Sequence, residues 1–201
     1  MAPSSLVRVG GALASIVAGA FVALGQLINL GGTQEYGTVF GQNLVLISHV
    51  AFVFAFVGLY AAQAERSGIL GQLGMVLGTI GTTLVAAIVF MELAGASGAT
   101  AAGAALEGVG SLSVYNIVGP LLFLAGIILF GVAVMRVGVF TRWTGWLLII
   151  GAVLGLLGGI VAVQIIFALG AVVAGVGFVW LGWELLSGGG EEAQQPTTRV
   201  S

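Results

Sequence analysis

Six long apolar stretches constrain this chain more than any other feature of its sequence. They run over residues 7–30, 43–64, 68–93, 114–135, 143–163 and 165–186. A helix needs about 20 residues to cross a bilayer, and each stretch is close to or above that length. A closed β-barrel also spans membranes, but these stretches lack period-2 alternation and are about twice as long as a barrel strand. We therefore predict an all-α transmembrane helix bundle of six spans.

The balance of apolar and charged residues supports this class. Of the 201 residues, 59% are hydrophobic and 6% are charged, whereas soluble domains carry about 25% charged residues. The start of the first stretch, where Arg8 is followed by the apolar residues 10–25, also has features of a signal peptide, but the apolar run exceeds the usual length of about 7–15 residues. We expect a six-span transmembrane domain over residues 1–187. From Gly188 onward the composition predicts a disordered cytoplasmic tail over residues 188–201.

The arginines orient the predicted bundle. Cytoplasmic loops carry an excess of basic residues, and aromatic side chains gather at the membrane surfaces. With six spans and both termini inside, every arginine is cytoplasmic: Arg8, Arg66, Arg136, Arg142 and Arg199. The four tryptophans and Tyr60 fall near the same face. The outer loops, residues 31–42 and 94–113, contain glutamates but no arginine. We therefore expect a multi-pass protein of the cell membrane with both termini cytoplasmic.

Several kinds of chemistry are absent from the sequence. The chain has no Cys, which excludes disulfides, thiolate metal sites and cysteine nucleophiles. It also has no Lys and no Asp, and it shows no P-loop, no Ser–His–Asp arrangement and no acidic pair at catalytic spacing. We expect no enzyme activity, no catalytic residue, no metal ion and no cofactor. The net charge of −2 gives no indication of a nucleic-acid partner, so the expected partner is the lipid bilayer.

Polar residues inside the spans concentrate in the predicted outer half. Such residues are costly in a membrane and often mark a functional site. The candidate ligand-binding residues are Gln26, His49, Glu92, Tyr115 and Asn116. Together they predict a pocket that opens outward. The alternative is structural: Glu92 would reach the outer membrane surface, and His49 would bond a polar neighbour on a packed helix face.

Helical spacing indicates where two of these residues face. Gly71, Gly74, Gly78 and Gly81 form one smooth stripe, and Glu92 lies on its extension, so we expect Glu92 to face the bundle. His49 shares a face with Phe52, Phe56 and Tyr60. This face would suit a flat apolar ligand, or a proton relay between His49 and Glu92.

Small residues at four-residue spacing predict close helix packing. Gly151, Gly155 and Gly159 form one such row, and Gly170–Ala174 and Ala171–Gly175 form two more in the next span. These rows favour a non-enzymatic membrane component that packs through Gly-rich helix faces against a membrane protein partner or as a homo-oligomer. The alternative function is a small transporter or ligand-binding membrane protein with its pocket around His49 and Glu92. A lipid-modifying enzyme would need a nucleophile or metal for which the chain offers no candidate.

The hinge between the fourth and fifth stretches reads Arg136-Val-Gly-Val-Phe-Thr-Arg-Trp-Thr-Gly-Trp-Leu-Leu-Ile-Ile-Gly151. It resembles a hinge of small bacterial multi-pass membrane proteins of unknown function, which typically reads Arg-x-x-φ-φ-Pro-Arg-Trp, with φ apolar. Thr141 stands where those proteins usually have Pro. The resemblance implies a multi-span membrane fold and assigns no activity. An Arg-x-Gly triplet also recurs at Arg8, Arg66 and Arg136, a hint of three repeated hairpins.

Overall fold

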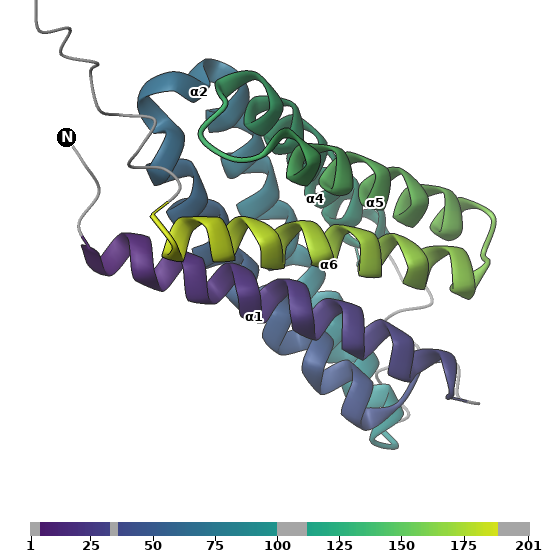
Figure 1. The fold of residues 1–201 in the computed structure, drawn as a ribbon. Helices are drawn as coiled ribbons and strands as arrows, with labels where there is room; N and C mark the ends of the chain where they lie inside the picture. The colour runs from purple at the N-terminus through teal and green to yellow at the C-terminus, as the bar shows by residue number, and fades with distance from the viewer. Residues whose placement is uncertain (1–4, 33–35, 100–111, 189–201) are drawn as a thin grey trace, which may run out of the picture.

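The computed structural model describes residues 5–32, 36–99 and 112–188, and the regular elements within them are α-helices (Figure 1). These are α1 (Ser5–Leu30), α2 (Val39–Ala96), α4 (Leu112–Val137), α5 (Arg142–Ile160) and α6 (Gln164–Leu186). Within the described residues, five helices are long and apolar enough to cross a membrane. This confirms the all-α class and the presence of helices long and apolar enough to span a membrane. The predicted disordered tail lies outside the described residues except for Gly188.

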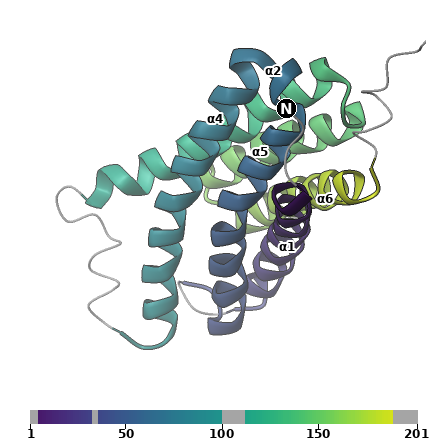
Figure 2. The ribbon, with the colours of Figure 1, turned by 90° about the vertical axis from the view of Figure 1, so that its left-hand side faces the viewer.

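Helix α2 is a hairpin of two antiparallel arms. It has 58 residues and turns at Gly68, whose backbone angles (φ 54°, ψ −154°) are not helical. Across the hairpin, Gln42 bonds Glu92 and His49 bonds Thr82. Figure 2 shows both arms descending from the bend at the top. Because α2 covers the stretches 43–64 and 68–93, the six apolar stretches correspond to six helical segments.

The helical segments form a closed ring in chain order. The first arm of α2 packs on α1, its second arm packs on α4, α4 on α5, α5 on α6, and α6 returns to α1. Glycines face each other at these contacts: Gly11 with Gly58, Gly78 with Gly126, Gly131 with Gly145, Gly155 with Gly170, and Gly19 with Gly175. A Cβ atom on one member of each pair (Gly11, Gly126, Gly145, Gly170 or Gly175) would press on the backbone of the facing glycine. The ring therefore depends on backbones that approach closely.

The predicted rows of small residues are largely these contacts. Gly151 meets Ala174 and Gly155 meets Gly170, so the row of α5 packs against the Gly170–Ala174 row of α6, while Gly175 packs against Gly19 of α1. Gly159 does not pack within the chain: it is exposed, and a Cβ atom added there would have no neighbouring atom within 4 Å. Gly158 makes the contact instead, against Phe167, because the chain leaves the helix two residues later, after Ile160.

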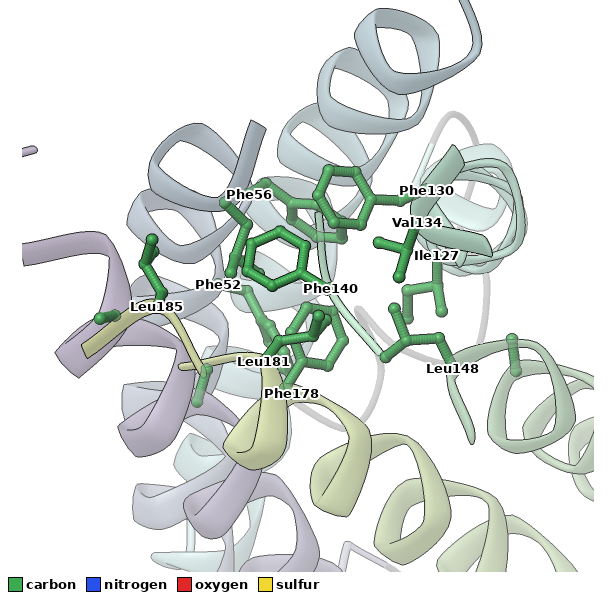
Figure 3. Close-up of a cluster of buried hydrophobic side chains, with 14 of the residues drawn as sticks. Phe52, Phe56, Ile127, Phe130, Val134, Phe140, Leu148, Phe178, Leu181 and Leu185 are labelled. Atoms are coloured by element: carbon green, nitrogen blue, oxygen red, sulfur yellow. The ribbon is translucent and has the colours of Figure 1, made fainter. Parts of the chain in front are cut away.

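One end of the bundle is solid. We call it the hinge end; it carries Gly68 and the link between α4 and α5, and Figure 1 shows the start of α1 and the end of α6 together there, at the left. Phenylalanines from different helices fill its interior (Figure 3). The Phe56 ring packs edge-to-face on Phe130 and Phe178, at centroid distances of 5.7 and 5.6 Å. Phe140, from the link itself, is buried in the same cluster.

The α4–α5 link closes the hinge end. The chain reverses at Gly138 (φ 70°) and buries Val139 and Phe140. The backbone N–H of Thr141 donates to the Glu184 carboxylate at 2.9 Å. A proline has no N–H, so a proline at position 141 could not make this bond to α6. Trp143, at 68% exposure, remains on the outer surface of the bundle.

We predict that Gly68→Ala destabilises the protein and that Gly10→Ala does not. Neither glycine has an atom within 4 Å of the place a Cβ would take, but Gly68 has a positive φ whereas Gly10 is helical. The strained backbone should cost roughly 1–3 kcal/mol at Gly68, while alanine in the helix at Gly10 should gain up to about 1 kcal/mol. Unfolding by SDS titration in mixed micelles measures both values. Equal effects would show that the turn at Gly68 is not as described.

Candidate functional site

A cavity of about 610 Å³ lies inside the ring, toward the end opposite the hinge end. We call this opposite end the loop end; it carries the α1–α2 and α5–α6 links. All six helical segments contribute to the wall, and the cavity is partly open to the outside. Its walls are mostly apolar, with Val22, Val45, Val85 and Leu124 among them. Ligand pockets commonly measure about 300–1,000 Å³ and have this composition.

The cavity exists because small residues and diverging helices leave the axis of the ring unfilled. Helices α4 and α5 touch near the hinge end, at Gly131 and Gly145. Nearer the loop end, a Cβ atom at Gly155 would meet only Leu124, at 3.8 Å. Helix α6 faces the space with Ala171. Short side chains on a ring of this width cannot reach one another across the axis.

The floor of the cavity is aromatic. The imidazole of His49 lies 5.1 Å from the ring of Phe123, edge-to-face, and 5.8 Å from the ring of Phe52. Phe52 and Phe123 are 5.3 Å apart. The predicted aromatic face of His49, Phe52 and Phe56 is therefore part of one cluster, and Tyr60 packs against it farther toward the hinge end.

His49 is held by the other arm of α2. Its Nδ1 lies 2.8 Å from the hydroxyl of Thr82, and that hydroxyl is 3.1 Å from the backbone carbonyl of His49. If the hydroxyl donates to the carbonyl, Nδ1–H is the donor to Thr82, and Nε2 is an acceptor. The structural interpretation of His49 is thus right for one ring nitrogen. His49 itself also lines the cavity.

The polar mouth of the cavity centres on Glu92 and Gln42. The Gln42 Nε2 group donates to the carbonyl of Tyr36 at 2.6 Å and to the Glu92 carboxylate at 3.2 Å. Gln42 is 5% exposed. Its Oε1 atom is buried without a hydrogen-bond partner among the described residues. Buried polar atoms are normally satisfied, so an unpaired one needs a specific explanation.

Most of the predicted site residues meet in this cavity. Gln26, His49, Glu92 and Asn116 all line it, from α1, both arms of α2, and α4. Tyr115 does not line the cavity and is 51% exposed. Successive residues on a helix point about 100° apart, so Tyr115 and Asn116 cannot both face the interior.

The predicted proton relay has no direct contact in this structure. Among the described residues, no hydrogen bond joins His49 to Glu92. Glu92 pairs with Gln42, and His49 lies seven residues farther along the same arm. Seven residues of helix correspond to about 10 Å, so the two ionisable groups occupy different depths.

Four lining residues with polar side chains were not predicted as site residues: Asn29, Tyr36, Gln42 and Gln164. Asn29 holds the mouth together, because its Oδ1 accepts from the backbone and hydroxyl of Thr38 at 3.0 and 3.3 Å. A sequence signal for Gln42 did exist. It precedes His49 by seven residues, a helical offset of about 20°, and therefore shares its face.

Within residues 5–32, 36–99 and 112–188, no three His, Cys, Asp or Glu side chains group closely enough to hold a metal ion. The polar groups of the cavity can therefore bind through hydrogen bonds and the charge of Glu92. No protein-family model, curated protein or solved structure matches this chain.

We predict that Thr82→Val destabilises the protein more than Thr83→Val does. Valine at position 82 keeps the shape but leaves Nδ1 of the buried His49 without its partner, at a cost of about 1–3 kcal/mol. The hydroxyl of Thr83 is exposed and bonds only its own helix, at Thr79, so its loss should change stability by less than about 0.5 kcal/mol. SDS unfolding of both variants tests the difference, and equal losses would contradict the described His49–Thr82 bond.

Proposed function

We propose that this protein is a non-enzymatic membrane protein that binds a small, largely apolar molecule in its central cavity. One observation carries the proposal: a cavity of about 610 Å³ has mostly apolar walls and a few polar groups that converge at its mouth. Ligand sites are typically built in this way. Elsewhere the ring packs backbone against backbone, so the hollow is a local feature of the fold.

We further propose six membrane crossings, with both termini cytoplasmic and the cavity opening outward. The 58 residues of α2 suffice for two crossings that turn at Gly68. Arg66, Arg136 and Arg142 lie within a few residues of the turns at the hinge end. Trp143 and Trp183, near the same end, are exposed on the surface of the bundle. Basic residues and tryptophans at one end support a cytoplasmic hinge end.

The solid hinge end supports binding over transport. Phe52, Phe56 and Phe178 are at most 1% exposed and separate the cavity from the hinge end. Transport would require a second arrangement in which this cluster opens, and that arrangement would have to be populated. Binding requires only the arrangement described here.

The alternative of a partner protein bound through glycine faces has less support. Gly11, Gly78 and Gly175 are all in contact with other helices of the same chain. The rows of small residues are therefore explained by packing within the ring.

We predict that filling the cavity removes its ligand. Ala171 lines the cavity, whereas Ala87 is exposed on the outside of the second arm of α2. Native mass spectrometry of protein released from its own membrane should show a small added mass for the wild type and for Ala87→Phe. The mass should be absent from Ala171→Phe because phenylalanine occupies its space. Bare protein in all three samples, or a mass retained by Ala171→Phe, would refute the proposal.

The proposed orientation is directly measurable because the chain has no cysteine. Ser97 follows α2 at the loop end and Ser187 follows α6 at the hinge end, and both are exposed. A membrane-impermeant maleimide applied to intact cells should label Ser97→Cys. It should label Ser187→Cys only after permeabilisation. The reverse pattern would place the mouth of the cavity in the cytoplasm, and labelling of both in intact cells would exclude an odd number of crossings between them.

A further inference from the structure

We infer that the cavity selects an organic cation: a molecule with a hydrogen-donating ammonium-type head and an elongated apolar body. This inference rests on the proposed function, since it names the chemistry of the ligand. The head would lie against the hydrogen-bonded pair of Glu92 and Gln42 at the mouth, and the body would extend to the aromatic floor at His49 and Phe123.

The Gln42 amide at the mouth has used both of its donor hydrogens and offers only an acceptor. Both bonds of the Gln42 amide donate from Nε2, one to Tyr36 and one to Glu92. Reversing the amide would set its oxygen against two other acceptor oxygens, so the orientation is fixed by its neighbours. Oε1 is consequently left as a buried acceptor with no partner among the described residues. A ligand that donates a hydrogen bond would satisfy it once a small shift of the Gln42 side chain exposes this buried atom to the cavity.

Charge favours the same ligand. Among the described residues that line the cavity, Glu92 is the only carboxylic acid, and none is an arginine. A carboxylate held in apolar surroundings is costly unless it is paired. An ammonium group would supply the missing countercharge and donate a charge-assisted hydrogen bond, which is stronger than a neutral one. A carboxylate or phosphate head would instead meet like charge and acceptor atoms.

The part of the cavity between the mouth and the aromatic floor determines the length and character of the ligand body. From Gln42 at the mouth to His49 at the floor is about 10 Å along α2, and Val22, Val45 and Val89 line the cavity along with them. The volume of the cavity, about 610 Å³, is much larger than the volume of an inorganic ion. An aryl group at the far end could pack edge-to-face with His49 and Phe123, as these rings already do with each other.

Three probes with one body and different heads test the inference: 4-phenylbutylamine, 4-phenylbutan-1-ol and 4-phenylbutanoate. Their dissociation constants are measured by calorimetry with the protein in phosphatidylcholine nanodiscs, and empty nanodiscs give the partitioning background. The amine should bind at least about tenfold more tightly than the alcohol, because hydrogen bonds to charged groups are the stronger ones. The carboxylate should bind most weakly.

In Glu92→Gln the amine should bind no more tightly than the alcohol. The dissociation constant of the alcohol should change by less than about twofold. Gln42→Leu, which removes the unpaired acceptor, should reduce the same advantage and provides a second variant if Glu92→Gln does not fold. Glu184→Gln is the matched control, since Glu184 bonds Thr141 at the hinge end. It should keep the order of the three probes.

The outcomes separate the two proposals. If the alcohol binds the wild type but not Ala171→Phe, and the amine shows no preference, the cation inference is wrong and the ligand cavity stands. If the carboxylate binds most tightly of the three probes, the cation inference is likewise wrong and the ligand cavity stands. If no probe binds above empty nanodiscs and native protein carries no added mass, the proposed function fails and the inference fails with it.

Discussion

Close approach of helix backbones is the interaction on which this bundle depends. Lipid is as apolar as a leucine side chain, so helices in a membrane gain stability from tight packing more than from burial. Facing glycines such as Gly11–Gly58, Gly78–Gly126 and Gly19–Gly175 provide that packing around the whole ring. A ring of helices leaves an axis to be filled. Phenylalanines fill it at the hinge end, whereas the small side chains of α5 and α6 leave it open at the loop end.

The two ends of the bundle therefore differ in kind. At the hinge end, side chains from α2, α4, α6 and the α4–α5 link meet on the axis, and the bond from Thr141 to Glu184 ties that link to α6. At the loop end the interior is hollow and the mouth of the cavity is polar. Among the described residues that line the cavity, Glu92 is the one carboxylic acid. Rigid packing beneath a pre-formed cavity suits selective binding, because the polar groups at the mouth keep their positions when a ligand arrives.

The sequence predicted the elements and much of the site, but not their arrangement. Apolar stretches of membrane length become helices because no other local structure satisfies the backbone there. The inward direction of Glu92 followed from the glycine stripe, because small residues mark the packed face. Tyr115 and Asn116 are adjacent polar residues on a helix that is apolar on all other sides, so nothing local showed which one faces inward. The ring order, and with it the pairing of Gln42 with Glu92, depends on contacts between distant segments.

The hairpin of α2 carries its own polar partners. The bonds that hold Glu92 and His49 both join one arm of α2 to the other. In the proposed topology, these two arms can enter the lipid as one unit during synthesis, with both groups already paired, before α4 is made. This avoids the cost of exposing unpaired polar groups to hydrocarbon. Each later helix then finds its neighbour already in place beside it. Only α6 has to find a partner made much earlier, α1, and its arrival closes the ring.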